Sequence, residues 1–486
     1  MKISTDRAAF CGILGESIDI YQAQHAVAAA YSKLGGYSSS RRERCKVVVG
    51  HDDSPAADMM TSAVCAALCA SGADVHMLGL VPSGAVSFIT VASGSMMGVM
   101  VTGSRYNFDV SGLKFYQKDG MQVTGELLES IQAAIDGGAL LGCKQSGRIL
   151  PADPSLLSKY RKNILDAAGF TMFEKLKVAV DCMNSACASF VEFSIRQLGA
   201  DVVLMDKSED SAYENTSKLI DFVRDTESDI GFTFSADGEV CIVALPDGKL
   251  LDSERLAEIF GMVYGRALNT EETTPLIMLS DNCHIALAPY IKSMGAEIRT
   301  VTGDYSYLAE ECAGFDNVIM AVDRFNGIIF PRRSSVPDGL LTAVMLLSCM
   351  NRMGMTIEEL WAEVPKLIRG TTSVVIPSGA FIPVMSTTDL EEEIRVMRSY
   401  LSGDGRVLMY RPDSGRVEII VEGIKSGQVS KVLEMAETVV RRNLRIPDGV
   451  TIFRRPEASG SSDSTAAPQN GGTPSGGTYM IVKKES

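Results

Sequence analysis

The stretch that decides the fold is KVVVGHDDSPAADMMTSAVCAALCASGADVHMLGL, residues 46–80. It opens with the short apolar run KVVVG, continues with a helical pattern from Pro55 to about Ser71, and ends with the second apolar run DVHMLGL. A Ser-Gly-Ala-Asp turn joins the helix to the second run. This order predicts a strand–helix–strand unit of a parallel sheet.

The same order of elements recurs twice further along the chain. One copy occupies Lys177–Met205 and the other occupies Pro275–Val301, and each passes from helix to strand through a Gly-Ala turn. The repetition predicts three related domains of doubly wound α/β type. Gly-Ala is also a common helix terminus, so ordinary capping remains an alternative reading of the turns alone.

The chain changes character from about Arg369. The runs RVLMY and VEIIVE flank the turn RPDSG, and a helical pattern follows from Gln428 to Arg442, which predicts an α+β domain. Pro456–Thr478 is rich in Ser, Gly, Thr, Ala and Pro, as in flexible tails. The apolar patch Tyr479–Val482 at its end is suited to weak docking on a sheet edge, and a frayed terminus is the alternative.

Composition excludes several classes of function. The 486 residues are 46% hydrophobic, and 46 Lys and Arg against 60 Asp and Glu give a net charge of −14. This balance disfavours nucleic acid and an anionic membrane as partners. The 11 cysteines include no CxxC pair, and the first residues contain no apolar signal segment. We therefore expect a cytoplasmic protein with reduced cysteines, as a monomer or homodimer.

Residues 99–120, VMVTGSRYNFDVSGLKFYQKDG, resemble the phosphoserine loop of the α-D-phosphohexomutase family. That family includes phosphoglucomutase, phosphomannomutase and phosphoglucosamine mutase, and its pattern is T-A-S-H-N-P followed by N-G-[IFL]-K-[FV]. Thr102-Gly103-Ser104 and Ser111–Phe115 occupy the pattern. Further landmarks follow in order over about residues 1–445, at Gly50-His51-Asp52, Leu80-Val81-Pro82-Ser83, Asp338–Ala343 and Arg411-Pro412.

The resemblance implies an α/β protein with three related mixed α/β domains plus a C-terminal α+β domain, arranged around a central cleft. The expected domains are residues 1–150 with the phosphoserine loop, 151–257 with the metal loop, 258–368 with the sugar loop, 369–450 with the phosphate loop, and 451–486 as the tail. Each of the four folded domains would give one loop to a hexose phosphate, the expected small-molecule partner.

The resemblance also implies roles for individual residues. Ser104 would carry the phosphoryl group, and Lys114 would act as acid/base, if its pKa is lowered, or as a phosphate contact. The remaining candidates are Ser235, Asp237 and Glu239 for Mg²⁺, Asp323 and Arg324 for the sugar, and Arg105, Arg411, Ser414, Gly415 and Arg416 for phosphate.

Several loops depart from the family pattern. The metal loop D-x-D-x-D-R falls on Ser235–Val240, which lowers the ligand charge from −3 to −2 and leaves Mg²⁺ binding open. The sugar loop replaces Ser-Gly by bulky residues. Two hypotheses follow: a phosphohexomutase of carbohydrate metabolism with reduced activity, or an inactive mutase-like protein that binds a sugar phosphate or a protein partner.

Each site residue also has a plain structural reading. Ser104 would then be a turn serine, Asp237-Gly238 a tight turn, and Lys114 a solvated lysine at a strand edge. If the family reading holds, Ser104 should lie within reach of Lys114 and Asp237.

Overall fold

The structure is a computed structural model that describes most of the chain. The described residues are 9–36, 44–103, 110–137, 145–169, 172–181, 185–205, 216–268, 273–302, 305–325, 327–366, 368–375, 387–401, 405–413, 416–423 and 425–443. They form two compact units, one within Met1–Asn282 and Met294–Glu363, the other within Cys283–Ser293 and Val364–Ser486. The predicted tail, with Tyr479–Val482, lies outside the described residues. The finer four-domain boundaries and the central cleft stay predictions.

The first sheet is mixed and has six strands in the order β1-β5-β4-β2-β3-β6. Its elements and the helices between them are β1 (Phe10–Ile13), α1 (Ile20–Lys33), β2 (Lys46–His51), α2 (Ala57–Ala70), β3 (Asp74–Leu80), α3 (Ser83–Ala92), β4 (Met97–Val101), β5 (Val110–Tyr116), α4 (Gly125–Asp136) and β6 (Ile149–Pro151). β5 pairs antiparallel with β4 on one side and with β1 on the other. Lys114 on β5 is only 2% exposed, so the reading of Lys114 as a solvated edge lysine is wrong.

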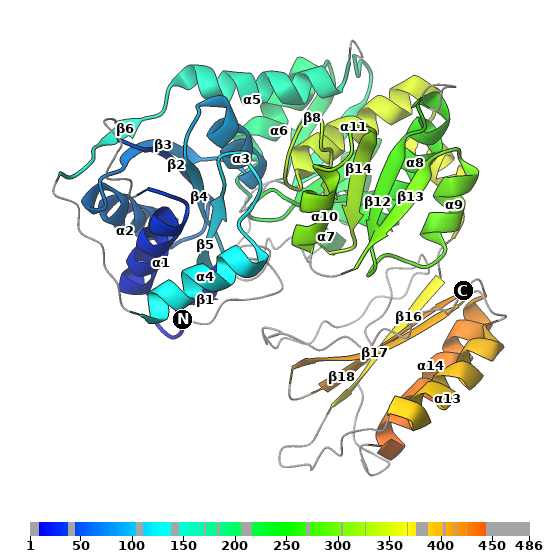
Figure 1. The fold of residues 1–486 in the computed structure, drawn as a ribbon. Helices are drawn as coiled ribbons and strands as arrows, with labels where there is room; N and C mark the ends of the chain where they lie inside the picture. Colours follow the sequence, from blue (N-terminus) through cyan, green and yellow to red (C-terminus); the bar gives the residue numbers. More distant parts are fainter. Residues whose placement is uncertain are drawn as a thin grey trace. The chain divides into compact units, whose positions relative to one another are not determined.

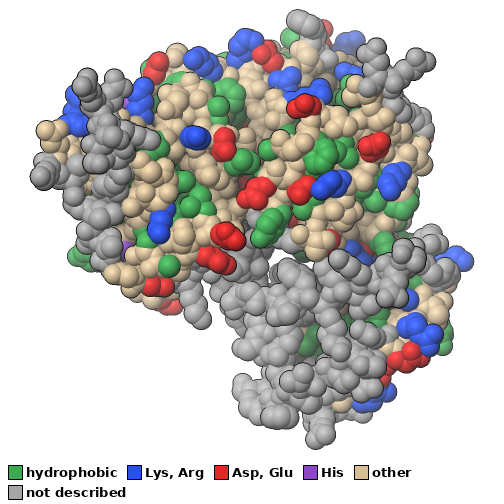
Figure 2. All heavy atoms as spheres, viewed as in Figure 1, with side chains coloured by type: hydrophobic (Ala, Val, Ile, Leu, Met, Phe, Trp, Pro, Cys, Tyr) green, Lys and Arg blue, Asp and Glu red, His purple; other side chains and the backbone are tan. Residues whose placement is uncertain are grey.

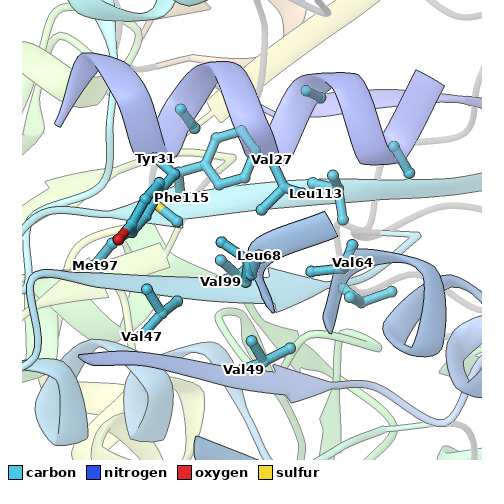
Figure 3. Packing of buried hydrophobic residues seen from close by; sticks show 14 of the residues in the cluster. Val27, Tyr31, Val47, Val49, Val64, Leu68, Met97, Val99, Leu113 and Phe115 are labelled. Carbon is cyan, nitrogen blue, oxygen red and sulfur yellow. The ribbon is translucent and has the colours of Figure 1, made fainter. Parts of the chain in front are cut away.

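The core of this sheet lies between its strands and the helices α1, α2 and α4. Figure 3 shows Leu113 and Phe115 of β5 packing with valines of β2 and β4 beneath Val27 and Tyr31 of α1. Neighbouring residues along a strand point to opposite faces of a sheet. Lys114 therefore points to the face opposite this core.

Two further mixed sheets follow in the same unit (Figure 1), ordered β11-β10-β9-β7-β8 and β13-β12-β14-β15. The elements of the first stretch are α5 (Pro154–Ala167), β7 (Lys177–Asp181), α6 (Ala188–Gln197), β8 (Asp201–Leu204), α7 (Thr216–Asp225), β9 (Ile230–Phe234), β10 (Cys241–Ala244) and β11 (Leu250–Leu251). Those of the second are α8 (Ser253–Leu268), β12 (Leu276–Ser280), β13 (Glu297–Val301), α10 (Tyr305–Cys312), β14 (Val318–Asp323), β15 (Gly327–Ile329), α11 (Gly339–Met353) and α12 (Ile357–Glu363).

The three Gly-Ala turns have one backbone geometry. Gly72, Gly199 and Gly295 have φ angles of 92°, 91° and 97°, and each follows the end of a helix. Glycine adopts this left-handed conformation without the steric cost that other residues meet. The turns therefore cap helices in addition to marking the repeated strand–helix–strand order, so the two readings of the sequence are compatible.

The second unit contains an antiparallel sheet ordered β16-β18-β17, with α13 and α14 on one face (Figure 1). Its elements are α9 (Leu287–Ser293), β16 (Ile368–Val375), α13 (Thr387–Tyr400), β17 (Arg406–Asp413), β18 (Arg416–Gly423) and α14 (Ser426–Asn443). The predicted fold class, three mixed α/β sheets plus a C-terminal α+β domain, is confirmed.

A buried ion cluster joins the segment before α9 to this sheet. Glu422 is fully buried, with its carboxylate oxygens 2.6 Å from Arg369 and 2.8 Å from Arg406. Ile285 N–H donates to Glu422 at 3.1 Å, and Arg406 donates to the Cys283 carbonyl at 2.6 Å. Burial would raise the pKa of Glu422, but the two arginines outweigh it and the pKa lies below its ordinary value. The cluster therefore holds the segment before α9 against the sheet of the second unit.

No single described helix is long and apolar enough to cross a membrane. The pair α11 and α12 passes the length and composition test only when taken together across an 83° bend. The residues of α11 from Gly339 to Val344 and from Leu346 to Met350 are buried inside the protein. Figure 2 shows Lys and Arg side chains interspersed with Asp and Glu over the visible face.

Glu258 on α8 is a fully buried carboxyl group. Neither of its oxygens accepts a hydrogen bond from the described residues, and Arg255 Nη1 lies 3.6 Å from Oε2. Burial raises the pKa of Glu258 from 4.5 to about 8, and Arg255 opposes that rise. Between these two pH values the folded chain keeps a proton that the unfolded chain releases.

Glu258→Gln should therefore change how stability depends on pH. As pH rises from 4.5 to about 8, the wild type loses stability because its unfolded state ionises first, whereas the amide does not titrate. The free energy of unfolding of Glu258→Gln relative to wild type should rise by on the order of 2 kcal/mol between pH 5 and pH 8. Denaturant titration at both pH values measures it, with exposed Glu363→Gln as control. If the free energy of unfolding of Glu258→Gln relative to wild type is the same at both pH values, Glu258 is not a protonated buried acid in the folded protein.

Candidate functional site

The predicted site loops occupy equivalent positions in the three mixed sheets. In each sheet a parallel strand is followed along the chain by its antiparallel neighbour, as β4 by β5, β9 by β10 and β14 by β15. The connections hold the phosphoserine, metal and sugar loops. The phosphate loop connects β17 and β18. Sequence patterns alone did not reveal this shared topology.

The metal loop is held by its own polar groups. Ser235 donates its hydroxyl proton to Asp237 Oδ1 at 2.6 Å and accepts the Val240 N–H at 3.0 Å. Glu239 N–H donates to the same Asp237 oxygen at 3.2 Å. All three predicted ligands are buried, with exposed fractions of 0–2%. Ser235 therefore orients Asp237 and closes the turn.

Three backbone N–H groups at or just before helix N-termini donate to consecutive carbonyl oxygens of the loop. The bonds run from Ala186 to Ala236, from Ser83 to Asp237 and from Gly339 to Gly238, each at 2.9 Å. Ser83 begins α3, Gly339 begins α11, and Ala186 lies two residues before α6. Helix N-termini carry partial positive charge. The loop's two carboxylates therefore lie in a field that favours negative charge.

Glycines allow the close packing around this loop. Gly238 has a φ of 74°, and a Cβ there would lie 2.5 Å from Cys187 Sγ. A Cβ on Gly339 would lie 3.0 Å from the Gly238 carbonyl oxygen, and one on Gly327 would lie 2.9 Å from the Glu239 carbonyl oxygen. The approach of the neighbouring segments thus requires residues without side chains.

Lys114 reaches the metal loop from the first sheet. Its Nζ lies 2.7 Å from Asp237 Oδ2 and 2.8 Å from Glu239 Oε2. Burial would lower the pKa of Lys114, but the two carboxylates outweigh it and the pKa lies above its ordinary value. Lys114 is therefore an ammonium in this arrangement, and the lowered pKa that an acid/base role needs is not met.

Asp52 fixes the chain that leads to Ser104. Its buried carboxylate accepts the Gly103 N–H at 3.1 Å, and its own N–H donates to the Val101 carbonyl at 3.1 Å. Burial raises the pKa of Asp52 against several hydrogen bonds that lower it. Ser104 and Arg105 lie outside the described residues. Asp52 was recognised from the sequence only as a landmark, without a role.

Asp338 is a second residue without a role assigned from the sequence. It caps α11 by accepting the Leu341 N–H at 3.0 Å and accepts the Tyr160 hydroxyl at 3.0 Å. Burial raises the pKa of Asp338 to about 6, against its hydrogen bonds. A Cβ on Gly84 would meet its carboxylate. Asp338 thus binds together α5, α11 and the start of α3.

The predicted sugar residues contact other parts of their own sheet. Asp323 is 2% exposed and accepts the Asn282 amide at 2.9 Å and the Phe325 N–H at 2.9 Å. Arg324 lies 3.8 Å from Glu254 and stacks over the Phe325 ring at 4.8 Å. Both side chains hold the loop in place, and their sugar contacts stay a prediction.

The phosphate loop lies in the second unit. Ser414 and Gly415 are outside the described residues, and only the backbone of Arg411 and Arg416 is described, in β17 and β18. Their predicted phosphate contacts therefore stay predictions.

The donors at the metal loop do not fit Mg²⁺ in the arrangement observed. Mg²⁺ needs about six oxygens near 2.1 Å, whereas the Lys114 ammonium contacts both carboxylates and the Ser235 hydroxyl serves the turn. Among the described residues, no group of three or more His, Cys, Asp or Glu side chains is placed to hold a metal ion.

Comparison with known proteins agrees with the fold. The sequence model described as phosphoglucomutase/phosphomannomutase, alpha/beta/alpha domain I, matches residues 12–140. Phosphoglucosamine mutase of Clostridium botulinum (strain Loch Maree / Type A3) is 25% identical over 418 residues, 83% of this chain and 91% of that protein.

Solved structures share the fold. A phosphoglucomutase/phosphomannomutase family protein from Burkholderia thailandensis has a TM-score of 0.73 at 18% identity, covering 93% of this chain and 100% of the other. Aspergillus fumigatus N-acetylphosphoglucosamine mutase, in complex with GlcNAc-6P and magnesium, has a TM-score of 0.52 at 15% identity over 74% of this chain and 92% of the other.

The chain is a member of the α-D-phosphohexomutase superfamily. Within it, the chain is a distant relative of the phosphoglucosamine mutases, at 25% identity.

Proposed function

We propose that this protein is a phosphohexomutase that moves a phosphoryl group between two hydroxyls of a hexose phosphate through Ser104. The phosphoryl group leaves Ser104 Oγ for one sugar hydroxyl, and the proton of that hydroxyl passes to the released Oγ. The phosphate at the other end of the sugar then transfers to Oγ and restores the phosphoserine.

One observation carries this proposal. Lys114, Asp237 and Glu239, which come from two different sheets, meet at one buried point, with Lys114 Nζ 2.7 Å and 2.8 Å from the two carboxylates. Lys114 pairs with Met100 of β4, the strand that leads to Gly103 and Ser104. The strand that leads to the predicted carrier and the strand that contains Lys114 are thus neighbours in one sheet, and Asp237 and Glu239 contact Lys114 from a loop of another sheet.

The chemistry needs positive charge at the transferring phosphoryl group. The Lys114 ammonium and the N-termini of α3 and α11 lie at the described site, where they already contact the carboxylates and carbonyls of the loop Ser235–Glu239. Magnesium, which is present in the structure of the Aspergillus relative, supplies such charge when bound. The donors observed at the loop Ser235–Glu239 do not fit this ion.

Glucosamine phosphate is the first sugar phosphate to test, because the Clostridium botulinum relative named above is a phosphoglucosamine mutase. The sugar loop gives no independent support for this choice, since Asp323 and Arg324 contact Asn282 and Glu254.

A second candidate function is binding of a sugar phosphate without turnover. It is favoured by the ion pairs that hold Lys114 as an ammonium with a raised pKa, because an ammonium cannot accept the proton of the attacking hydroxyl. A binding protein needs phosphate contacts but no proton acceptor.

Phosphorus NMR of the full chain with a hexose 1-phosphate distinguishes the two functions. Incubation with the 1-phosphates of glucosamine, glucose, mannose and N-acetylglucosamine, each with a trace of the corresponding 1,6-bisphosphate, should give the 6-phosphate of at least one sugar. Ser104→Ala should lower the rate by about 10³-fold or more, because the carrier oxygen is lost.

The matched control is Ser62→Ala, an exposed serine on α2. Its rate should equal the wild-type rate. Binding of a hexose phosphate without conversion would support the second function, and conversion by Ser104→Ala at the wild-type rate would refute the proposed mechanism.

A further inference from the structure

The metal loop carries two negative charges that need a partner. Asp237 is 0% exposed and Glu239 is 2% exposed. Removing two carboxylates from water costs far more than folding can offset unless a cation or several hydrogen bonds compensate them.

Lys114 provides that cation from a fixed position. The ammonium carries one positive charge and three donors, and its hydrogen bonds to the two carboxylates are 2.7 Å and 2.8 Å long. β5 has a paired strand on each side, so the backbone of Lys114 is held in register opposite Met100.

The remaining negative charge is also compensated. The ends of α3 and α11 and the chain before α6 donate to the three carbonyls of residues 236–238. Each helix N-terminus is equivalent to roughly half a positive charge. The loop is thus close to neutral without a metal ion.

Ser235 completes this arrangement. A carboxylate at this position would add a third negative charge, whereas the hydroxyl donates to Asp237 and accepts from Val240. The loop therefore matches one monovalent ammonium better than a divalent ion.

We propose that the Lys114 ammonium takes the place of a divalent cation in the loop Ser235–Glu239, so that the loop keeps its structure and charge without metal. The inference does not depend on Ser104 or on turnover. It has one direct consequence: removing the ammonium should leave two buried carboxylates facing each other, and a divalent cation should then bind between them.

The wild-type protein gives the first test. Its thermal unfolding in EDTA should match that in millimolar Mg²⁺ or Mn²⁺ within about 1 °C, and electron paramagnetic resonance should detect no saturable Mn²⁺ binding. Stabilisation of the wild type by about 5 °C or more would overturn the inference, because a metal would then be part of the native loop.

Lys114→Ala gives the second test, with exposed Lys118→Ala as the control for loss of a nearby positive charge. Lys114→Ala should unfold at lower temperature in EDTA, regain about 5 °C or more on addition of Mn²⁺, and bind about one Mn²⁺. Lys118→Ala should respond as the wild type does.

A third variant keeps the test informative if Lys114→Ala does not fold. Lys114→Ala/Asp237→Asn/Glu239→Gln removes the charges together and should fold without responding to Mn²⁺. Two results would show that a divalent ion cannot replace the ammonium, and the inference would then fail. In the first, the triple variant folds but Lys114→Ala folds in neither EDTA nor Mn²⁺. In the second, Lys114→Ala folds but does not bind Mn²⁺.

Discussion

Lys114→Met should lower the free energy of unfolding by about 3–5 kcal/mol, one of the largest effects expected in the chain. The substitution keeps most of the side-chain volume but removes the ammonium that lies 2.7 Å from Asp237 and 2.8 Å from Glu239. The two carboxylates then remain buried without their counter-ion. Denaturant titration in EDTA measures the loss.

Two comparisons separate lost charge from lost packing. Lys114→Met/Asp237→Asn/Glu239→Gln removes both sides of the ion pair and should recover most of the stability. Exposed Lys118→Met should change it by no more than about 0.5 kcal/mol. If Lys114→Met lowers the free energy of unfolding by less than about 1 kcal/mol, the lysine forms only a solvent-exposed ion pair, which contradicts its burial.

Gly238→Ala should destabilise the protein by about 2–4 kcal/mol, from backbone strain and steric overlap together. Gly238 has a φ of 74°, and the added methyl group would lie 2.5 Å from Cys187 Sγ and 2.7 Å from Pro82 Cβ. Because these atoms belong to the segments before α6 and α3, the loop must move away from both. Thermal and denaturant unfolding measure the effect.

Gly354→Ala is the matched control for that experiment. Gly354 ends α11 with a φ of 64°, and a Cβ there would meet nothing within 4 Å. Its cost should be the backbone term alone, about 1–2 kcal/mol. Equal losses for the two variants would contradict the close packing around the metal loop.

Local patterns were enough to predict the repeated fold. The apolar run KVVVG and the run DVHMLGL become β2 and β3, and KVAVD becomes β7 with the predicted bounds. The expected helix from Pro55 begins two residues later, at Ala57. The burial of short apolar runs and the left-handed glycines at helix ends depend on residues that are neighbours in the chain. A short stretch of sequence is therefore enough to predict them.

The side-chain partners at the site could not be predicted in the same way. Lys114 and Asp237 are 123 positions apart, and Tyr160 and Asp338 are 178 apart. Family resemblance identified Lys114 and Asp237 as candidates, but their contact depends on how two sheets pack. Asp52 was visible as a landmark, and only the fold connects it to Gly103.

Peptide mass spectrometry shows whether Ser104 carries the phosphoryl group, on which the proposed function depends. The full chain is incubated with glucosamine 1,6-bisphosphate, digested, and analysed for phosphate on the peptide that contains Ser104. We expect one phosphate on Ser104 and its loss on incubation with the unphosphorylated sugar or a hexose monophosphate. Phosphate on another residue only, or none on Ser104 in wild-type protein that interconverts hexose phosphates, would contradict it.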